Sequence, residues 1–188
     1  MSWRSVNGMG GRGVDQEQFL QATLRHADVL HALARRLAPR PADAADIVQE
    51  TYLRAYAAWR RQRPEDTGAW LATICLNVGR DHLRRHLRHP TAPGPVPDLP
   101  SVLDTEQQAL DHQATDQVHV LLMTLPEAQR IAITLMDVCG FTAGQVAVIT
   151  GAPRGTVLAR VHRGRKRLAL SLNRDGAMPA QREARDEP

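Results

Sequence analysis

Residues 140–168 read GFTAGQVAVITGAPRGTVLARVHRGRKRL, and this stretch decides the fold of the second half of the chain. Its apolar spacing predicts a short helix over 142–149. Residues 150–152 (TGA) predict a tight turn, and Pro153 then opens a longer helix that runs to about 171. Two helices joined by a short glycine-containing turn, with a basic second helix, are typical of a helix-turn-helix.

The second of these helices has two distinct faces. Val157, Val161 and Leu168 recur at core spacing, and a polar stripe is rotated from them by about 100°. The stripe consists of Thr156, Arg160, Arg163 and Arg167, with Arg154 at the start of the helix. Such a helix can lie in the major groove of DNA with its cations on phosphates and base edges. The alternative is that the cations complement the helix C-terminus, which accounts for about two or three charges, whereas residues 154–167 carry six.

Helical periodicity also organises the rest of the chain. Apolar residues at helical spacing predict helices over about 30–37, 42–60, 67–87 and 106–123, and another that runs through Ile131, Leu135 and Val138 to Gly140. Thr124 and Glu127 fit a capping box for this last helix. No run of alternating β-branched residues occurs, so strands are not expected. The sequence therefore predicts an all-α protein with two small helical domains.

Charge and proline content mark the boundary between these domains. Residues 89–129 contain no lysine or arginine, and residues 89–100 (HPTAPGPVPDLP) contain five prolines, which predict a semi-extended, acidic linker. Basic residues cluster at the C-terminal end of each unit, which favours binding of a polyanion at two places. We predict a first domain over 15–88, a linker over 89–105, a second domain over 106–172, and flexible ends over 1–14 and 173–188.

Composition excludes several classes of protein. The chain has 188 residues, of which 43% are hydrophobic, and a formal net charge of +4, so it is not a disordered chain. It has no apolar run long enough to span a membrane, and its N-terminus lacks the apolar core of a signal peptide, so a cytoplasmic protein without membrane contact is expected. Phosphate-binding loops, dinucleotide fingerprints and hydrolase motifs are missing, so we expect no enzyme activity, no catalytic residues and no cofactor.

Histidine and cysteine suggest two weaker alternatives. His82, His86 and His89 recur at i, i+4 and i+7, which would place three imidazoles on one side of a helix, but nothing obvious completes a metal site. We therefore expect no metal. Cys75 and Cys139 are too few for a disulfide framework, and buried thiols are usually inert, so a redox switch between the units is the less favoured interpretation.

The order of these elements resembles the extracytoplasmic-function (ECF) sigma factors of the sigma-70 family. The resemblance covers about 24–88 and 117–170. Four motifs carry it: DAADIVQETYL at 43–53, WLATICLNVGRDHLRR at 70–85, LPEAQR at 125–130 and GTVLARVHR at 155–163. Each motif alone is weakly specific, but their order and spacing together are fairly specific.

The resemblance implies a bacterial initiation factor that binds core RNA polymerase and directs it to promoters. The family's motif places the polymerase contact at Asp46, Gln49 and Glu50, whose i, i+3, i+4 spacing puts them on one helical face. The alternative is that these acids only balance the helix dipole. Members of the family are often held inactive by an anti-sigma factor, so such a factor is a candidate partner besides polymerase and promoter DNA.

The resemblance also implies that the first domain melts the minus-ten element and that the second domain reads the minus-thirty-five element. A flipped base needs a pocket, and the displaced strand needs cations and stacking surfaces. The resemblance assigns the minus-ten contacts to Asp66, Thr67, Asn77, Arg80, Arg84 and Arg85, and the minus-thirty-five contacts to the stripe on the last helix. Trp70 is a candidate for stacking, although an aromatic residue at the start of a buried helix is more often part of the core.

The chain departs from the family's pattern in the last two helices. Leu158 and Ala159 replace a basic or polar residue and a serine, Gly144 replaces a glutamate, and Pro153 supplies no side-chain cap. The main competing interpretation is a stand-alone helix-turn-helix regulator. An acidic face at Asp46 that binds polymerase would distinguish a sigma factor from such a regulator.

Overall fold

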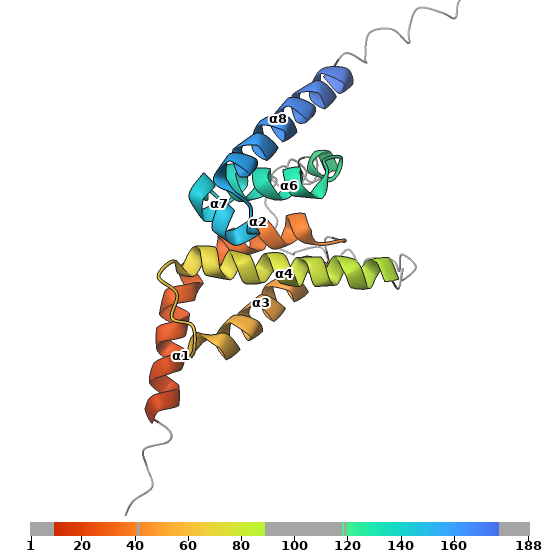
Figure 1. Ribbon diagram of the computed structural model, residues 1–188. Coiled ribbons are helices and arrows are strands. Elements are labelled where there is room, and N and C mark those ends of the chain that lie inside the picture. The colour runs from red at the N-terminus through yellow and green to blue at the C-terminus, as the bar shows by residue number, and fades with distance from the viewer. Residues whose placement is uncertain (1–9, 41, 89–117, 119, 177–188) are drawn as a thin grey trace, which may run out of the picture. The chain divides into compact units, whose positions relative to one another are not determined.

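The computed structural model describes residues 10–40, 42–88, 118 and 120–176 (Figure 1). Every regular element in these residues is helical, which confirms the predicted all-α class. The chain divides into two compact units, one built mainly on the N-terminal helices and one on the C-terminal helices. The predicted linker and most of the helix expected over 106–123 lie outside the described residues. None of the described helices is both long and apolar enough to cross a membrane.

Three packed helices form the core of the first unit. The elements of this unit are α1 (Gly10–Thr23), the 3-10 turn η1 (Leu24–His26), α2 (Ala27–Leu37), α3 (Asp43–Trp59) and α4 (Thr67–Arg88). Each of α2, α3 and α4 contacts the other two, and each contributes fully buried side chains such as Leu33, Ile47 and Leu71. A Cβ atom on Gly79 would lie 2.8 Å from Leu37 Cβ, so glycine is what lets α4 approach α2 this closely.

Local sequence explains where these helices start and stop. The chain leaves α2 at Ala38, which is extended with ψ 134°, because Pro39 disfavours a helical residue before it. Helix α4 begins where the Asp66 carboxylate accepts a hydrogen bond from the Ala69 amide at 2.9 Å. The observed bounds of α2, α3 and α4 agree with the predicted helices to within a few residues.

Helix α1 differs from the prediction, because residues 10–14 were expected to belong to a loose glycine-rich end and instead start this helix. Tertiary contacts made later in α1 outweigh the poor helix propensity of its first turn. Phe19 is buried and packs edge-to-face on Tyr56 and Trp59 of α3, with ring centroids 5.2 and 5.5 Å apart. Asp15 also pairs with Arg60 at 2.9 Å.

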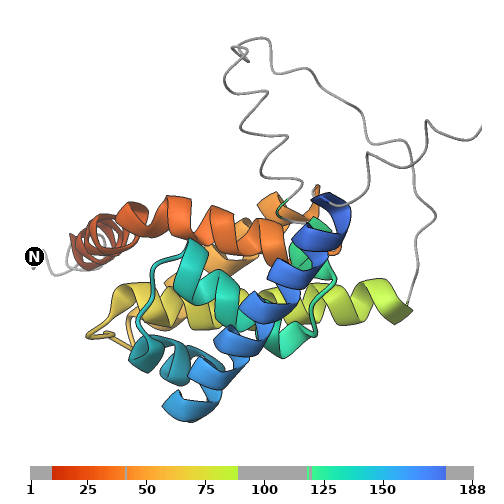
Figure 2. The same ribbon diagram turned by 90° about the horizontal axis from the view of Figure 1, so that it is seen from above.

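Two helices meet in the core of the second unit. Residues 118 and 120–123 are helical and are followed by α6 (Glu127–Ile133), the π-helical segment η2 (Thr134–Val138), α7 (Ala143–Thr150) and α8 (Arg154–Gly176). Helix α6 packs against α8 (Figure 2), and Ile133 and Val161 meet in a buried cluster with Leu122 and Leu125. Helix α8 runs to Gly176, so its last residues extend into the segment that was expected to be a flexible end.

Two glycines shape the helix-turn-helix region. Gly140 ends the η2 segment with φ +74°, and Gly151 lies between α7 and α8 with φ +66°. Such positive φ angles are accessible to glycine at little cost. The predicted short helix, turn and long basic helix are thus confirmed at α7, Gly151 and α8.

The predicted capping box of Thr124 and Glu127 does not form. The Thr124 hydroxyl instead donates to the Leu121 carbonyl at 2.7 Å, and Pro126 occupies the cap position of α6 with no side-chain cap. The Thr124 amide also donates to the Leu121 carbonyl, at 3.2 Å, so both groups of Thr124 bond back to the preceding helical turn. A capping box that was not predicted forms at the start of α7. The Gln145 side chain accepts a hydrogen bond from the Thr142 amide at 2.9 Å, and the Gln145 amide donates to the Thr142 hydroxyl at 3.3 Å.

Candidate nucleic-acid and partner surfaces

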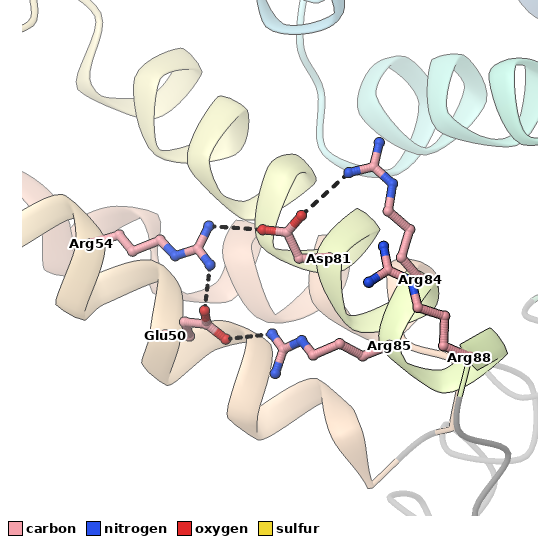
Figure 3. Close-up of a pocket in the computed structure, with 6 residues that line it drawn as sticks. All are labelled: Glu50, Arg54, Asp81, Arg84, Arg85 and Arg88. Atoms are coloured by element: carbon pink, nitrogen blue, oxygen red, sulfur yellow. Dashed lines mark hydrogen bonds and ion pairs between the residues drawn. The ribbon is translucent and has the colours of Figure 1, made fainter.

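The predicted polymerase-binding residues do not all face solvent in the same way. Asp46 and Gln49 are exposed on α3, whereas Glu50 is half-buried and turns toward α4 (Figure 3). The i, i+3, i+4 spacing put the three residues on one helical face, but that face borders the contact between α3 and α4. Asp46 and Gln49 are therefore the members of this set that are open to a partner.

Glu50 lies at the centre of a cluster of charged side chains that joins α3 to α4. Its carboxylate accepts hydrogen bonds from Arg54 at 2.5 Å, His82 Nε2 at 2.8 Å and Arg85 at 3.2 Å. Arg54 also reaches Asp81 at 3.1 Å. We call these five residues the Glu50 cluster. Three of its contacts cross from α3 to α4, two from Glu50 and one from Arg54, so the cluster fixes how the two helices sit against each other.

The electrostatics of Glu50 follow from these contacts. Burial opposes ionisation of the carboxyl group, but hydrogen bonds from His82, Arg54 and Arg85 outweigh burial and lower the pKa of Glu50 below its usual value. Glu50 is therefore held as a carboxylate by its cationic neighbours. A carboxylate that already satisfies three donors has less capacity to bind a further protein.

A shallow cavity of about 410 Å³ opens beside this cluster (Figure 3). Its lining consists of Glu50, Arg54, Asp81, Arg84, Arg85 and Arg88. Four guanidinium groups against two carboxylates leave the cavity with an excess of positive charge. Phosphate oxygens are suitable ligands for such a surface because arginine can bind them through two parallel hydrogen bonds.

The predicted minus-ten residues fall into two groups in the structure. Asp66 caps α4 and Thr67 is buried at 7% exposure, so these two side chains support the start of the helix. Asn77 is exposed, Arg80 is half-buried, and Arg84 and Arg85 are exposed along α4. The structure thus brings the basic members together on α4 and leaves Thr67 with little open surface for a base.

Trp70 lies at the edge of an aromatic group at the start of α4. Its ring centroid is 6.1 Å from that of the buried Trp59, and its indole N–H donates to Gln62 at 3.2 Å. Trp70 is half-buried, in line with the preference for a core role over a stacking role. Its hydrogen bond to Gln62 ties α4 to the loop that follows α3.

The predicted duplex-binding stripe lies along the first four turns of α8. Arg154, Arg163 and Arg167 are exposed, whereas Thr156 and Arg160 are half-buried beside the core-facing side of the helix. Val157 and Val161 are buried, as predicted, while Leu168 is only partly buried against the same core. The first turn of α8 contains no acidic residue. The stripe therefore presents exposed cations on a helix that starts without an acidic residue, which suits binding to a polyanion.

Comparison with known proteins decides the family. The family model for Sigma-70 region 2 matches residues 8–89, and the model for Sigma-70 region 4 matches residues 115–168. The ECF RNA polymerase sigma factor SigM of Mycobacterium tuberculosis is 35% identical over 159 residues, which make up 84% of this chain and 79% of that protein. The chain belongs to the ECF RNA polymerase sigma factors. The family resemblance drawn from the four motifs is thereby confirmed.

Further known proteins are similar to the chain in sequence or in structure. EcfG of Rhodopseudomonas palustris is 34% identical over 150 residues, or 79% of this chain and 81% of that protein. The sigma factor RpoE of Bartonella quintana, solved with the anti-sigma factor NepR, matches with a TM-score of 0.66 and 28% identity over 84% of this chain and 98% of that chain. CnrH, solved with the cytosolic domain of CnrY, also matches with a TM-score of 0.66, at 25% identity over 85% of this chain and 90% of that chain.

Several charged contacts on these surfaces could not be predicted from the sequence. The Glu50 cluster was missed because its members are up to 35 positions apart and no local spacing connects them. Arg165 was counted among the basic residues of the last helix, but it pairs with Asp137 of η2, at 2.5 Å between its Nη2 and Oδ1. This pair fastens α8 to the preceding segment, so Arg165 differs from the exposed cations of the stripe.

The metal-site and redox-switch alternatives can be compared with the structure of this sigma factor. Among the described residues no group of three or more histidine, cysteine or carboxylate side chains is arranged to hold a metal ion. His82 is engaged with Glu50, and His89 lies outside the described residues. Cys75 is buried, Cys139 is half-buried, and neither forms a disulfide.

Proposed function

We propose that this sigma factor binds core RNA polymerase through α3 and contacts promoter DNA with α4 and α8. The observation that carries the proposal is the acid-free start of α8, which presents exposed arginines directly after a helix-turn-helix turn in a chain of the ECF family. A helix in this position reaches base edges with its N-terminal residues and phosphates with its flanks. Promoter duplex at the minus-thirty-five element is the ligand that suits this surface.

The polymerase contact is proposed to centre on Asp46 and Gln49. Both side chains are exposed on α3, whereas Glu50 is held by the cations around it. An exposed carboxylate beside an amide can pair with basic and polar groups of a partner surface. We therefore assign direct binding to Asp46 and Gln49, and assign to Glu50 the task of fixing α3 against α4.

The minus-ten contact is proposed to use the arginines of α4. Arg84 and Arg85 are exposed, and with Arg88 they line the positively charged cavity. Binding to the phosphates of a displaced single strand would exchange the ion pairs with Glu50 and Asp81 for new ones. Asp66 and Thr67 are proposed to act on the base mainly through the loop that they stabilise.

Contact with two promoter elements at once explains how two surfaces of low individual affinity give specificity. Two modules joined in one chain convert the second contact into an intramolecular event, which raises the overall affinity without any new contact. The known relatives are transcription initiation factors, which supports a cytoplasmic, non-enzymatic role. The structural relative RpoE, solved with the anti-sigma factor NepR, supports an anti-sigma factor as a further partner.

Binding to polymerase can be tested by co-purification with core enzyme. Asp46→Arg is expected to weaken binding roughly tenfold or more, because a like charge facing a basic surface costs several kcal/mol. Glu17→Arg makes the same change of charge on the exposed surface of α1 and should leave binding unaltered. Equal binding by both variants and the wild type would refute the assignment of Asp46.

Promoter selection can be tested by in vitro transcription with core polymerase and a pooled promoter library. The wild-type chain should direct initiation at a defined set of sequences, and Arg163→Ala should reduce it. Arg25→Ala removes an exposed arginine outside both proposed DNA surfaces and serves as the matched control. Unchanged transcription by the Arg163 variant would show that the proposed docking face of α8 is wrong.

A further inference from the structure

The outward face of the first turns of α8 is uncharged at its centre. Gly155, Leu158 and His162 are exposed there, and Ala159 is half-buried between them. Leu158 lies four residues after the first residue of α8, and 42% of its surface is exposed. Apart from His162, the side chains in the part of the helix best placed to face a ligand are thus small or apolar.

Positive charge borders this centre on both edges. With about 100° of rotation per residue, Arg154 falls on one edge and Arg160 and Arg163 fall on the other, whereas Lys166 follows on the line of the strip one turn later. No acidic residue occurs between positions 154 and 174. Cations on two edges of an uncharged strip match the major groove, whose two walls are phosphate backbones and whose floor consists of base edges.

The chemistry of Leu158 narrows what it can contact on that floor. A leucine side chain neither donates nor accepts a hydrogen bond. Among the groups that base pairs present in the major groove, the C5 methyl of thymine is the apolar one. We propose that Leu158 reads a thymine methyl group in the duplex element bound by α8; this inference rests on the proposed function.

Gly155 supports the close approach that such a contact requires. It lies one turn before Leu158, and a Cβ atom added there would have no neighbour within 4 Å. The fold itself therefore does not require glycine at this position. Its small size leaves room for the groove wall to come near the helix where Leu158 projects.

The expected effect is small but measurable. Burying one methyl group contributes about 0.8 kcal/mol, which corresponds to about a fourfold change in affinity. Replacing the relevant thymine by dU removes only the methyl group and leaves every hydrogen-bonding group of the base in place. Wild-type holoenzyme should therefore lose about fourfold in affinity when dU occupies that position.

The experiment uses holoenzyme assembled from core polymerase and the full chain. Duplexes are first selected from a random pool, and each thymine in the bound element is then replaced in turn by dU. Leu158→Ala should bind the parent duplex more weakly and should no longer distinguish thymine from dU at one position. Leu170→Ala removes a similarly exposed leucine farther along α8 and should keep the wild-type response.

The outcomes separate this inference from the proposed function. Selective binding by the wild type that is insensitive to dU at every position would overturn the role of Leu158 and leave the proposed function standing. An equal response to dU in the wild type and the Leu158 variant would also overturn the role of Leu158 and leave the proposed function standing. A holoenzyme that selects no sequence at all would overturn both.

Discussion

Replacing Glu50 with glutamine tests whether this residue holds α3 to α4. The substitution keeps the size of the side chain but removes the charge that Arg54, His82 and Arg85 share. Partly exposed ion pairs each contribute about 0.2–1 kcal/mol and a hydrogen bond about 0.5–1.5 kcal/mol, so losing the two arginine pairs and weakening the His82 hydrogen bond should lower the free energy of unfolding by about 1–2 kcal/mol. The glutamine oxygen can still accept one neutral hydrogen bond, which keeps the loss toward the lower end of this range.

Urea unfolding followed by tryptophan fluorescence reports on the stability of the first structural unit. Trp59 belongs to α3 and Trp70 to α4, and the second structural unit has no tryptophan. The unfolding midpoint should fall for Glu50→Gln, while the slope stays constant. Asp46→Asn is the matched control, because Asp46 is exposed outside the cluster, and it should change stability by less than about 0.5 kcal/mol.

The stability difference between the wild type and Glu50→Gln should also depend on pH and salt, which provides a second test. Because the pKa of Glu50 is lowered by folding, its stabilising contribution is present above the unfolded carboxyl pKa and is lost as the pH falls through the folded pKa. The gap between wild type and Glu50→Gln should therefore close in acid, and it should narrow at high salt. A gap of the same size at every pH and salt concentration, or no gap at neutral pH, would refute the structural role assigned to Glu50.

Three further substitutions test the packing of the two units. Gly164→Ala should destabilise the second unit by about 1–2 kcal/mol, because a Cβ atom there would lie 2.5 Å from Ile133 Cδ1 in the core; faster amide hydrogen exchange in α8 would report it. Gly155→Ala meets open space and should instead stabilise α8 by up to about 1 kcal/mol, seen as slower exchange in the same helix. Phe19→Leu should cost about 1–2 kcal/mol through lost edge-to-face contacts, and a shift in Trp59 fluorescence would accompany it.

The helix bounds could be predicted because the signals that set them are local. Pro39 ends α2, and the apolar spacing of Val48 and Ala55 identifies the buried face of α3. Gly151 supplies the positive φ angle at the turn before α8. Each of these features depends on a residue and its near neighbours, so one sequence contains enough information to find it.

The state of Glu50 could not be predicted for the opposite reason. Its spacing from Asp46 shows that both residues lie on the same side of α3, but it does not show which residues of α4 come opposite. Arg85 and His82 reach Glu50 only through the packing of the two helices. The same holds for α1, where the packing of Phe19 on the aromatic residues of α3 makes a glycine-rich start helical.

The two proposed DNA surfaces of this sigma factor differ in how their positive charge is balanced. On α4, Arg84 pairs with Asp81 and Arg85 pairs with Glu50, so these cations are already partly neutralised and held in place. On α8, Arg163 and the other stripe residues have no acid in the surrounding sequence. An unbalanced helix attracts a duplex from a distance, whereas a balanced one binds phosphate only by giving up existing ion pairs. If the two proposed surfaces bind DNA, we therefore expect α8 to engage intact duplex first and α4 to take up the separated strand once melting brings that strand within reach.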